Sequence, residues 1–283
     1  MNATKTAAIL THQRVEETAE PVERVATGLR EAGFQVIATA EEAAKHERAQ
    51  LSAVDDPVAA APDIAVVLGG DGTMLEALRD YARTKTIVFS FNYGAVGFLA
   101  TLERDRIDEG IRRIVESDYD VLALPTLVVK PAAGERIAVN DIAFLRRSGA
   151  RVAELAYLVH GELIAQARCD GLVVATPVGS TGYNLANGGP IMAWGVQGFV
   201  VSFIAPHTLT ARTLVASTSD VLVVRNLSLE EPVDVETDGR RVCTLEPGQD
   251  LEVRFEDHPA HLAKVPGTGF YEQLRGKFGR LVG

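Results

Sequence analysis

A glycine-rich segment carries the first residues that could do chemistry. It reads Gly69-Gly70-Asp71-Gly72-Thr73 and directly follows an apolar run at residues 64–68. Glycines let a backbone turn sharply and approach a ligand closely. The amides that open a following helix attract an anion. The segment is therefore predicted to be a phosphate-binding loop.

Asp71 is unexpected in a phosphate-binding loop, because its carboxylate would repel a phosphate there. It is suited to accept a proton from an attacking hydroxyl, or to hold a magnesium ion that bridges phosphates. The alternative is an ordinary strand-to-helix turn capped by Asp71 or Thr73. Two other phosphate motifs are excluded: there is no Gly-x4-Gly-Lys-Ser/Thr loop, and Leu75 stands where a dinucleotide fingerprint needs glycine.

A second polar stretch, at residues 170–190, is dense in glycines and hydroxyls. Ser180 and Thr181 offer hydroxyl and amide donors, and Tyr183 offers a flat face for a ring. Asp170 is suited to accept a hydrogen bond from a ribose hydroxyl or a carboxamide. The alternative is a cluster of polar β-turns, but long ordered loops are usually functional.

Asn140 and Asp141 follow a short β run at residues 137–139. Neighbouring side chains in a strand point to opposite faces, so both meet one ligand only at a bulge or strand end. Two adjacent acceptors suit a vicinal diol, and the alternative is a solvated turn pair. Four arginines near these loops are candidates to contact phosphates, or are solvated surface charges: Arg146, Arg147, Arg151 and Arg168.

The first hundred residues alternate strand and helix signals. Apolar runs predict strands at residues 6–10, 34–38, 64–68 and 87–91. Helical spacing predicts helices at residues 21–32, 41–51, 73–83 and 104–117. This order predicts an α/β domain with an open, mostly parallel sheet. Ligands of such sheets bind beyond the carboxyl ends of the strands, where the glycine-rich segment lies.

The pattern changes near residue 119. Short runs rich in Val, Leu and Ile recur at residues 121–129, 136–145, 154–159, 172–175, 222–225, 233–236 and 251–254. They predict an all-β, β-sandwich-like domain of antiparallel hairpins. Helical spacing returns at residues 270–278. We therefore expect an α/β domain at residues 1–118, joined by residues 262–283, and a β-rich domain at residues 119–261.

Composition limits the class of protein. The chain has 283 residues, 47% hydrophobic and 23% charged, as in ordinary globular proteins. Its net charge of -10 argues against general nucleic-acid binding. Only two cysteines are present, which argues against a disulfide framework or a Cys-rich metal site. No secretory signal or membrane span is recognisable, so a cytoplasmic protein without membrane contact is expected.

Together these segments resemble the NAD kinase family, also called inorganic polyphosphate/ATP-NAD kinases. The matching segments occur in the family's order at residues 69–73, 92–94 through 97–99, 140–141, 170–190, 206–210 and 238–239. The glycine-rich segment alone is shared with diacylglycerol and sphingosine kinases, whereas residues 170–190 are more specific to this family.

The resemblance implies an activity. A family member transfers the terminal phosphoryl group of ATP, or in some members of polyphosphate, to the 2'-hydroxyl of the adenosine ribose of NAD, giving NADP. A divalent cation, Mg²⁺ above all, is implied, although the resemblance identifies no metal ligand in this chain. It also implies that NAD and ATP are the ligands, that residues 119–261 bind NAD, and that the protein forms a homodimer or homotetramer.

The resemblance also implies residue roles. Asp71 resembles the proton acceptor, and Asp71 and Gly72 resemble contacts to NAD. Further candidate substrate-binding residues are Asn140, Asp141, Arg151, Arg168, Asp170, Thr181, Gly182, Tyr183, Asn184, Leu185, Ala186 and Arg240. The chain departs from the family where Asp141 replaces Glu, Val178 replaces Thr, Gly182 replaces Ala and Arg240 replaces Gln. Arg240 adds a positive charge suited to a phosphate.

Two other functions are compatible with parts of the sequence. A lipid or small-alcohol kinase would use the same glycine-rich segment, but it leaves residues 170–190 unexplained. A non-catalytic NAD(H)-binding sensor would bind NAD without forming NADP. The presence of Asp71 in an intact loop favours an enzyme.

Overall fold

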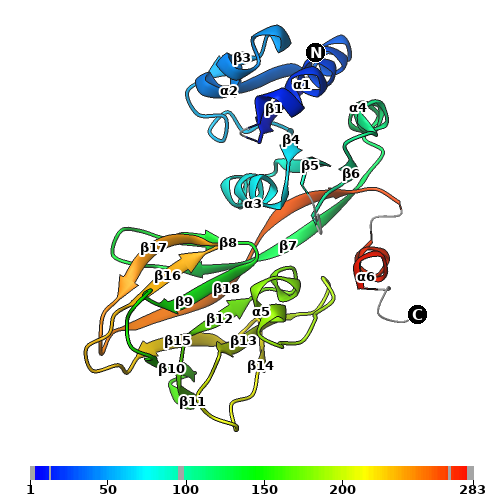
Figure 1. Cartoon of the computed structure of the whole chain (residues 1–283). Helices are drawn as coiled ribbons and strands as arrows, with labels where there is room; N and C mark the ends of the chain where they lie inside the picture. Colours follow the sequence, from blue (N-terminus) through cyan, green and yellow to red (C-terminus); the bar gives the residue numbers. More distant parts are fainter. Residues whose placement is uncertain (1–3, 13, 95–98, 267–268, 279–283) are drawn as a thin grey trace. The chain divides into compact units, whose positions relative to one another are not determined.

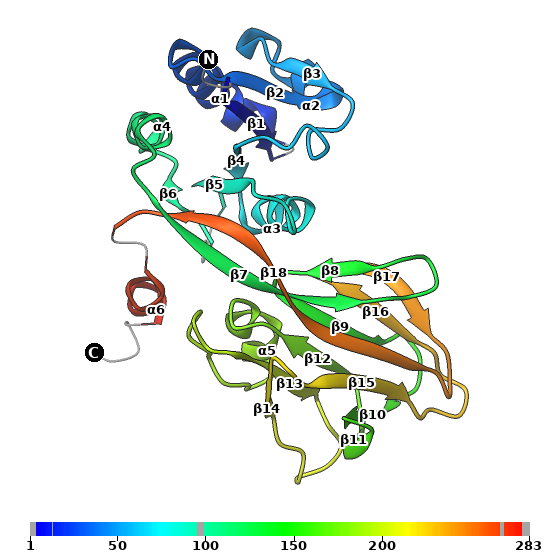
Figure 2. The same ribbon diagram turned by 180° about the vertical axis from the view of Figure 1, so that it is seen from behind.

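The computed structural model describes residues 4–12, 14–94, 99–266 and 269–278 (Figures 1 and 2). It divides into two compact units, residues 1–123 with 260–283, and residues 124–259. The first is an α/β unit with a mostly parallel sheet, and the second is built from antiparallel strands. This confirms the predicted fold class.

The sheet of the α/β unit has the strand order β3-β2-β1-β4-β5, and all of these neighbours are parallel. Its strands are β1 (Thr6–Thr11), β2 (Gln35–Thr39), β3 (Ser52–Val54), β4 (Ile64–Gly69), β5 (Ile87–Asn92) and β6 (Leu102–Glu103). Every residue of β4 is buried, as expected for a central parallel strand covered on both faces. Pairing of Gly69 with Asn92 brings the carboxyl ends of β4 and β5 together.

Helices cover this sheet. They are α1 (Val15–Glu31), α2 (Ala40–Lys45), the short 3-10 helix η1 (Glu47–Ala49), α3 (Asp71–Asp80) and α4 (Ile107–Glu116). The last helix of this unit, α6 (Phe270–Phe278), follows β18 in the chain. Figures 1 and 2 show α3 and α4 on opposite sides of β4 and β5. One hydrophobic core joins α1 and α4 to the strands, with Val22, Leu29 and Ile114 from the helices.

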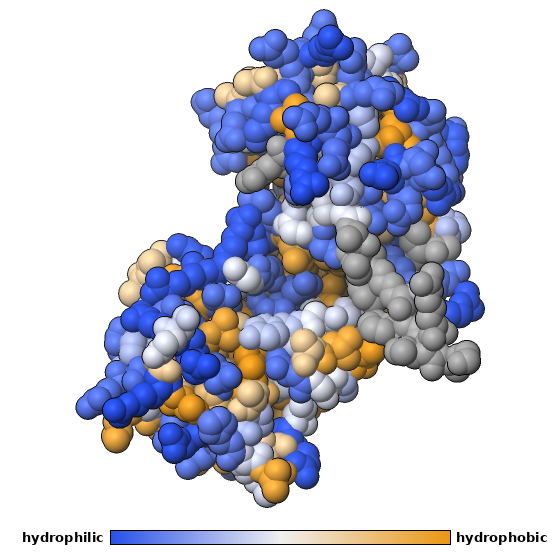
Figure 3. Space-filling view, in the orientation of Figure 1, coloured by the Kyte–Doolittle hydropathy of each residue, from blue (hydrophilic) through white to orange (hydrophobic). Residues whose placement is uncertain are grey.

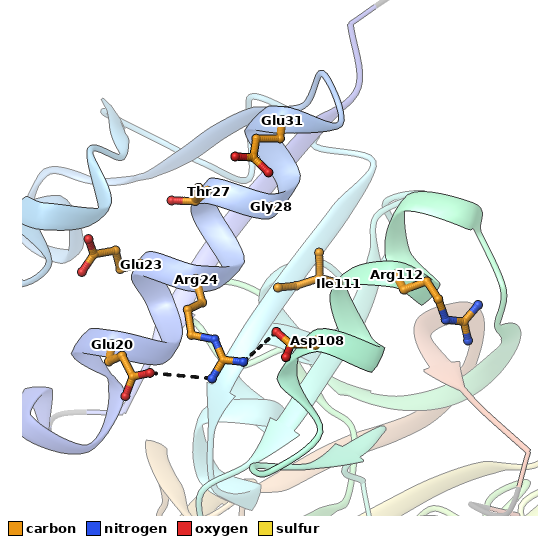
Figure 4. A pocket seen from close by; sticks show the side chains of 9 residues that line it. All are labelled: Glu20, Glu23, Arg24, Thr27, Gly28, Glu31, Asp108, Ile111 and Arg112. Atoms are coloured by element: carbon orange, nitrogen blue, oxygen red, sulfur yellow. Dashed lines mark hydrogen bonds and ion pairs between the residues drawn. The ribbon is translucent and has the colours of Figure 1, made fainter.

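The contact between α1 and α4 is close. A Cβ atom on Gly28 would lie 2.7 Å from Cγ2 of Ile111, so only glycine allows this helix approach. Arg24 of α1 pairs with Asp108 of α4 at 2.6 Å (Figure 4). Their side chains line an acidic groove of about 580 Å³.

The β-rich unit is a sandwich. One sheet has the order β14-β13-β12-β9-β16-β17, and the other contains β11-β10-β15-β18 with the β7–β8 hairpin beside β18. The strands are β7 (Asp120–Val129), β8 (Arg136–Ala138), β9 (Asp141–Arg146), β10 (Ala153–Val159), β11 (Glu162–Cys169), β12 (Gly171–Ala175), β13 (Gly198–Ile204), β14 (Leu214–Ser217), β15 (Val221–Asn226), β16 (Val233–Thr237), β17 (Arg240–Leu245) and β18 (Asp250–Lys264). One core contains Phe144 and Phe199 from the first sheet and Tyr157 from the second.

Several predicted elements are corrected by the structure. Helix α1 begins at Val15, six residues before the prediction, and contains Pro21. Thr18 and Val22 are both fully buried on its inner face, so packing outweighs the proline. The helix predicted at residues 41–51 ends at Lys45, because His46 and the left-handed Gln50 (φ 49°) interrupt it.

The β-rich unit carries most of the exposed large hydrophobic side chains. Eight of the ten such side chains among the described residues belong to it, including Leu209 and Leu229, which are almost fully exposed. In the space-filling view, hydrophobic residues are more frequent on this unit than on the outer helices of the α/β unit (Figure 3). Within the described residues, none of the helices combines the length and apolar character needed to cross a membrane.

Candidate active site

The glycine-rich segment forms the junction between β4 and α3. Gly69 is the last residue of β4, Gly70 is the N-cap of α3 with extended backbone, and Asp71 is the first residue of the helix. The carbonyl of Gly70 accepts the amide of Met74 at 3.1 Å, which closes the first helical turn. The helix therefore starts immediately at the carboxyl end of the sheet, as the phosphate-loop prediction requires.

Two of the glycines are needed for packing. A Cβ atom on Gly69 would lie 2.6 Å from Cβ of Thr73, and one on Gly94 would lie 3.0 Å from Cα of Gly70. The carbonyl of Gly69 also accepts the amide of Tyr93 at 2.9 Å. By contrast, a Cβ atom on Gly72 would meet no heavy atom within 4 Å. Gly72 faces open space, where a ligand can approach its backbone.

The segment after β5 braces this turn. The side-chain oxygen of Asn92 accepts the amide of Gly94 at 3.0 Å, while its amide group donates to Glu103 at 3.1 Å and 3.3 Å. The family resemblance extends over residues 97–99, but residues 97 and 98 lie outside the described residues.

Asp71 is partly exposed in the first turn of α3. A negative charge there is stabilised by the helix dipole and the outward amides. The carboxylate is thus placed by the backbone of a ten-residue helix rather than by a loose loop. It can act as a hydrogen-bond acceptor or as a proton acceptor at the edge of the sheet.

A second set of site residues lies in the β-rich unit. Strands β8 and β9 are separated by Val139 and Asn140, so the single run predicted at residues 136–145 is interrupted. Three consecutive amides donate to the carboxylate of Asp238: Val139 at 3.0 Å, Asn140 at 2.7 Å and Asp141 at 3.2 Å. The sequence predicts that Asn140 and Asp141 meet one ligand only at a bulge or a strand end. The break between β8 and β9 provides such a strand end.

Within the described part of the chain, the Asn140 side chain carries an unsatisfied hydrogen-bond acceptor. Its Oδ1 atom is buried and has no hydrogen-bond partner among the described residues. An unsatisfied buried acceptor is costly unless a donor reaches it. A ribose hydroxyl would supply that donor.

Asp141 lies next to this acceptor and is 8% exposed. Burial, followed by the negative charges of Asp238 and Glu236, raises the pKa of Asp141 to about 7. A strongly shifted carboxyl at a polar cluster is typical of a functional site. The group therefore changes its charge near neutral pH.

The loop after β12 packs against the same peptide. The hydroxyl of Thr176 donates to the Val139 carbonyl at 2.7 Å and accepts the Gly179 amide at 3.1 Å. A Cβ atom on Gly179 would lie 2.0 Å from the carbonyl oxygen of Asn140. This contact requires glycine at position 179.

The predicted NAD loop contains η2 (Gly179–Thr181) and α5 (Tyr183–Ala186). Asn184 is fully buried: its amide donates to the Ser180 and Pro190 carbonyls at 3.0 Å each, and its oxygen accepts from Ser202. Asn184 thus organises the loop. Among the other predicted residues here, Thr181 and Leu185 are half-buried, and Gly182, Tyr183 and Ala186 are exposed.

The pKa of Tyr183 is raised by burial and by nearby carboxylates. Burial raises its pKa first, and the charges of Glu236, Asp141 and Asp170 raise it further. The phenol stays protonated and keeps an exposed ring face available for stacking.

The candidate arginines separate into two groups. Arg146 pairs with Asp170 at 2.5 Å, and Arg147 pairs with Asp234 at 3.0 Å, so both hold the β-rich unit together. Arg151, Arg168 and Arg240 are exposed at its surface.

The residues present fit a metal ion that is held mainly by its nucleotide. No group of three or more His, Cys, Asp or Glu side chains converges among the described residues. Mg²⁺ commonly keeps several waters and binds through one or two carboxylates and substrate phosphates. Asp71, a partly exposed carboxylate in the first turn of α3, would be suited to that role.

Asp238 and Thr176 were not predicted as site residues. Asp238 and Gly239 have positive φ values of 47° and 74° and form the two-residue turn between β16 and β17. The Asp-Gly pair between two apolar runs signals that turn in the sequence. Its hydrogen bonds to residues 139–141 come from the fold and have no local signal.

Comparisons with known proteins agree with this geometry. Residues 7–119 match the family described as the ATP-NAD kinase N-terminal domain, and residues 139–265 match the ATP-NAD kinase C-terminal domain. An NAD kinase of Paraburkholderia phytofirmans is 32% identical over 96% of this chain and 93% of its own length. One from Gemmatimonas aurantiaca is 34% identical over 77% of each chain.

Solved structures show the same fold. Yeast NADH kinase in complex with NADH superimposes with a TM-score of 0.87 at 22% identity, covering 99% of this chain and 89% of that one. An NAD kinase from Archaeoglobus fulgidus in complex with ATP gives a TM-score of 0.75 at 25% identity, covering 98% of both chains.

A glycine-rich turn between a buried parallel strand and the start of a helix is typical of α/β proteins that bind phosphate groups. The family matches then fix the particular kind: the chain belongs to the ATP-NAD kinase family. It is a kinase that phosphorylates NAD.

Proposed function

We propose that this enzyme transfers the terminal phosphoryl group of ATP to the 2'-hydroxyl of the adenosine ribose of NAD, with Asp71 as the proton acceptor. The observation that carries the proposal is the position of Asp71, the first residue of α3 directly after the buried strand β4. Residues 1–118 with 262–283 form the phosphate-handling domain in this proposal, and residues 119–261 bind NAD.

The acceptor hydroxyl must be held before it can react. Asn140 has a buried oxygen without a partner among the described residues, and Asp141 lies beside it. Two neighbouring acceptors match the two hydroxyls of a ribose diol. This pair is proposed to bind NAD together with Asp170, Tyr183 and other exposed residues of the predicted set.

The residues of the glycine-rich turn then handle charge and the proton. The carboxylate of Asp71 takes the proton of the 2'-hydroxyl of NAD. The hydroxyl oxygen forms a bond to the terminal phosphorus of ATP, and the bond between that phosphorus and the departing ADP breaks. Amides around Gly72 face the transferring group and stabilise its negative charge. Mg²⁺ bound with the nucleotide would neutralise charge on the phosphate oxygens.

The proposal extends to a phosphate contact, to assembly and to location. Arg240, in place of the usual Gln, is proposed to contact a phosphate of the dinucleotide. The exposed hydrophobic side chains of the β-rich unit suit a homodimer or homotetramer interface. Two cysteines without a disulfide between them fit a cytoplasmic location.

One assay tests the proposal. The protein is incubated with NAD and Mg²⁺, with ATP or polyphosphate as donor, and NADP is measured. In separate reactions, NADH, diacylglycerol or sphingoid base replaces NAD as the phosphoryl acceptor. We expect NADP to form with ATP and no lipid to be phosphorylated. Binding of NAD without any NADP would instead indicate a sensor.

A further inference from the structure

The α/β unit has a pocket at the edge of its sheet opposite the glycine-rich turn. It has a volume of about 630 Å³ and is lined by the residues at which β1, β4 and β5 begin, including Lys5, Ile64 and Ile87. Strand β4 has six residues, so its two ends lie about 16 Å apart. A ligand in this pocket would not reach Asp71.

The charge of this pocket is opposite to that of the whole chain. Three cationic side chains line it, from Lys5, Arg83 and Lys85, and the single carboxylate is that of Asp63. One oxygen of Asp63 already accepts the amide of Thr6 at 2.7 Å. The chain as a whole carries a net charge of -10. The lining therefore favours an anion.

Two other pockets of the same unit provide a contrast. The groove between α1 and α4 is lined by four carboxylates and two guanidinium groups (Figure 4). A pocket of about 330 Å³ beside Thr11 and Thr73 is lined by four carboxylates and one lysine. Positive charge thus gathers specifically at the pocket where the strands begin.

The lining of the pocket also contains apolar side chains, including the two aromatic rings of Phe34 and Tyr119. The ammonium group of Lys5 lies 5.6 Å from the centre of the Phe34 ring. Tyr119 packs edge-on against Phe89, with ring centres 5.9 Å apart. Burial, and then the charge of Asp63, raises the pKa of Tyr119, so its phenol remains a hydrogen-bond donor. An aromatic lining of this kind favours a ligand with a planar, apolar body.

The loops around the pocket hold unusual backbone conformations. Seven non-glycine residues have positive φ among the described residues, and three of them line this pocket: Ala61 (45°), Arg83 (66°) and Ser117 (56°). Such conformations are unfavourable for residues with a Cβ atom and recur at ligand-binding sites.

We propose that this pocket binds a small anion with a planar aromatic body, so that the anionic group meets Lys5, Arg83 and Lys85 while the ring packs on Phe34 and Tyr119. Aryl carboxylates, aryl sulfonates and nucleoside monophosphates share this chemistry. The site is separate from the one that phosphorylates NAD.

Naphthalene-2-sulfonate titrated into the full chain by calorimetry tests the proposal, with neutral 2-naphthalenemethanol as the matched ligand. We expect the sulfonate to bind, and the alcohol to bind at least about tenfold more weakly, because it lacks the charge. Saturating NAD and ATP should leave sulfonate binding unchanged. A second titration, with AMP at saturating NAD, tells whether nucleotides use the pocket.

The double variant Lys5→Glu/Lys85→Glu should weaken sulfonate binding at least about tenfold while NADP formation stays at the wild-type rate. Lys130→Glu, an exposed lysine of the β-rich unit, makes the same kind of charge change elsewhere and should leave binding intact. If the double variant unfolds, Lys5→Gln/Lys85→Gln replaces it. Equal affinity in the charge variants, displacement by NAD, or no sulfonate binding at all would overturn the proposal.

Discussion

The carboxylate of Asp238 accepts a hydrogen bond from the backbone amide of Asn140 at 2.7 Å. The same carboxylate accepts the amides on either side, so the turn between β16 and β17 fixes the peptide that presents Asn140 and Asp141. In the proposed NAD site, Asp238 would act on the ligand through these neighbours, since it positions the two acceptors. Loss of its carboxylate should therefore affect NAD binding more than the chemical step.

Replacement of Asp238 tests this positioning role. In Asp238→Ala we expect KM for NAD to rise roughly 10- to 100-fold, because hydrogen bonds to a charged acceptor contribute about 1.5–3 kcal/mol. The kcat should fall by much less. Steady-state kinetics at varied NAD give both values. Asp220→Ala is the control, since Asp220 likewise accepts the amide of Ser217 in a turn of the same unit. An equal effect of both variants would show a general loss of stability.

Asp71→Asn tests the proton acceptor. The variant keeps the size of the side chain and the start of α3, but the amide cannot take a proton. We expect kcat to fall about 10²- to 10⁴-fold, the usual contribution of a general base, while the Kd for NAD stays within a few-fold. Calorimetry with NAD and an NADP assay separate the two effects. Asp80→Asn, at the other end of the same helix, is the matched control. Near-normal turnover of Asp71→Asn would exclude Asp71 as the base.

The pKa of Asp141 predicts how stability changes with pH. It is raised to about 7 in the folded chain and is close to 3.9 in an unfolded one. Between these values the folded state binds the extra proton, so the contribution of Asp141 to stability falls as pH rises from about 4 to about 7 and then levels off. Burial raises the pKa of Glu236 too, and adds a change of the same sign. Denaturant unfolding across this pH range measures the effect.

Asp141→Asn removes the titrating group and should flatten that profile. Relative to the wild type, we expect the variant to gain roughly 2–4 kcal/mol at pH 8, because it no longer ionises in a buried position. Asp141→Glu keeps the charge and should keep the pH dependence. A wild-type profile that rises between pH 5 and 7, with no change in Asp141→Asn, would contradict the assignment.

The parts of the fold that the sequence predicts are those specified by local pattern. The apolar run at residues 64–68 corresponds to β4, which is buried throughout, and the glycines after it mark the junction with α3. Strand β11 was missed because most of its residues are exposed at the edge of a sheet. Its strand structure depends on pairing with β10, and no local sequence pattern indicates that pairing.

The candidate site residues that were predicted from sequence are likewise those with a local sequence pattern. Residues 69–73 and 170–190 were found because glycines and hydroxyls concentrate there in sequence. Asp238 was missed as a site residue because its partner Asn140 lies 98 residues away. Only the pairing of β16 with β9 brings the two together. The individual contacts to NAD remain predictions.

The contact between Gly179 and Asn140 leads to a prediction about a single methyl group. In Gly179→Ala the new Cβ would lie 2.0 Å from the Asn140 carbonyl oxygen and 2.4 Å from its carbonyl carbon. Backbone atoms cannot rotate away as a side chain does, so the loop or the Asn140 peptide must shift. We expect a loss of stability of roughly 1–3 kcal/mol, the usual range for overpacking.

Gly195→Ala provides the matched control, because a Cβ atom there would meet no heavy atom within 4 Å. Thermal unfolding of both variants should separate a destabilised Gly179→Ala from an unchanged Gly195→Ala. The KM for NAD should rise in Gly179→Ala even at temperatures where it is fully folded, since the displaced peptide carries the Asn140 acceptor. If KM were unchanged in the folded variant, the position of Asn140 would not govern NAD binding, and the ribose would have to be held by other residues.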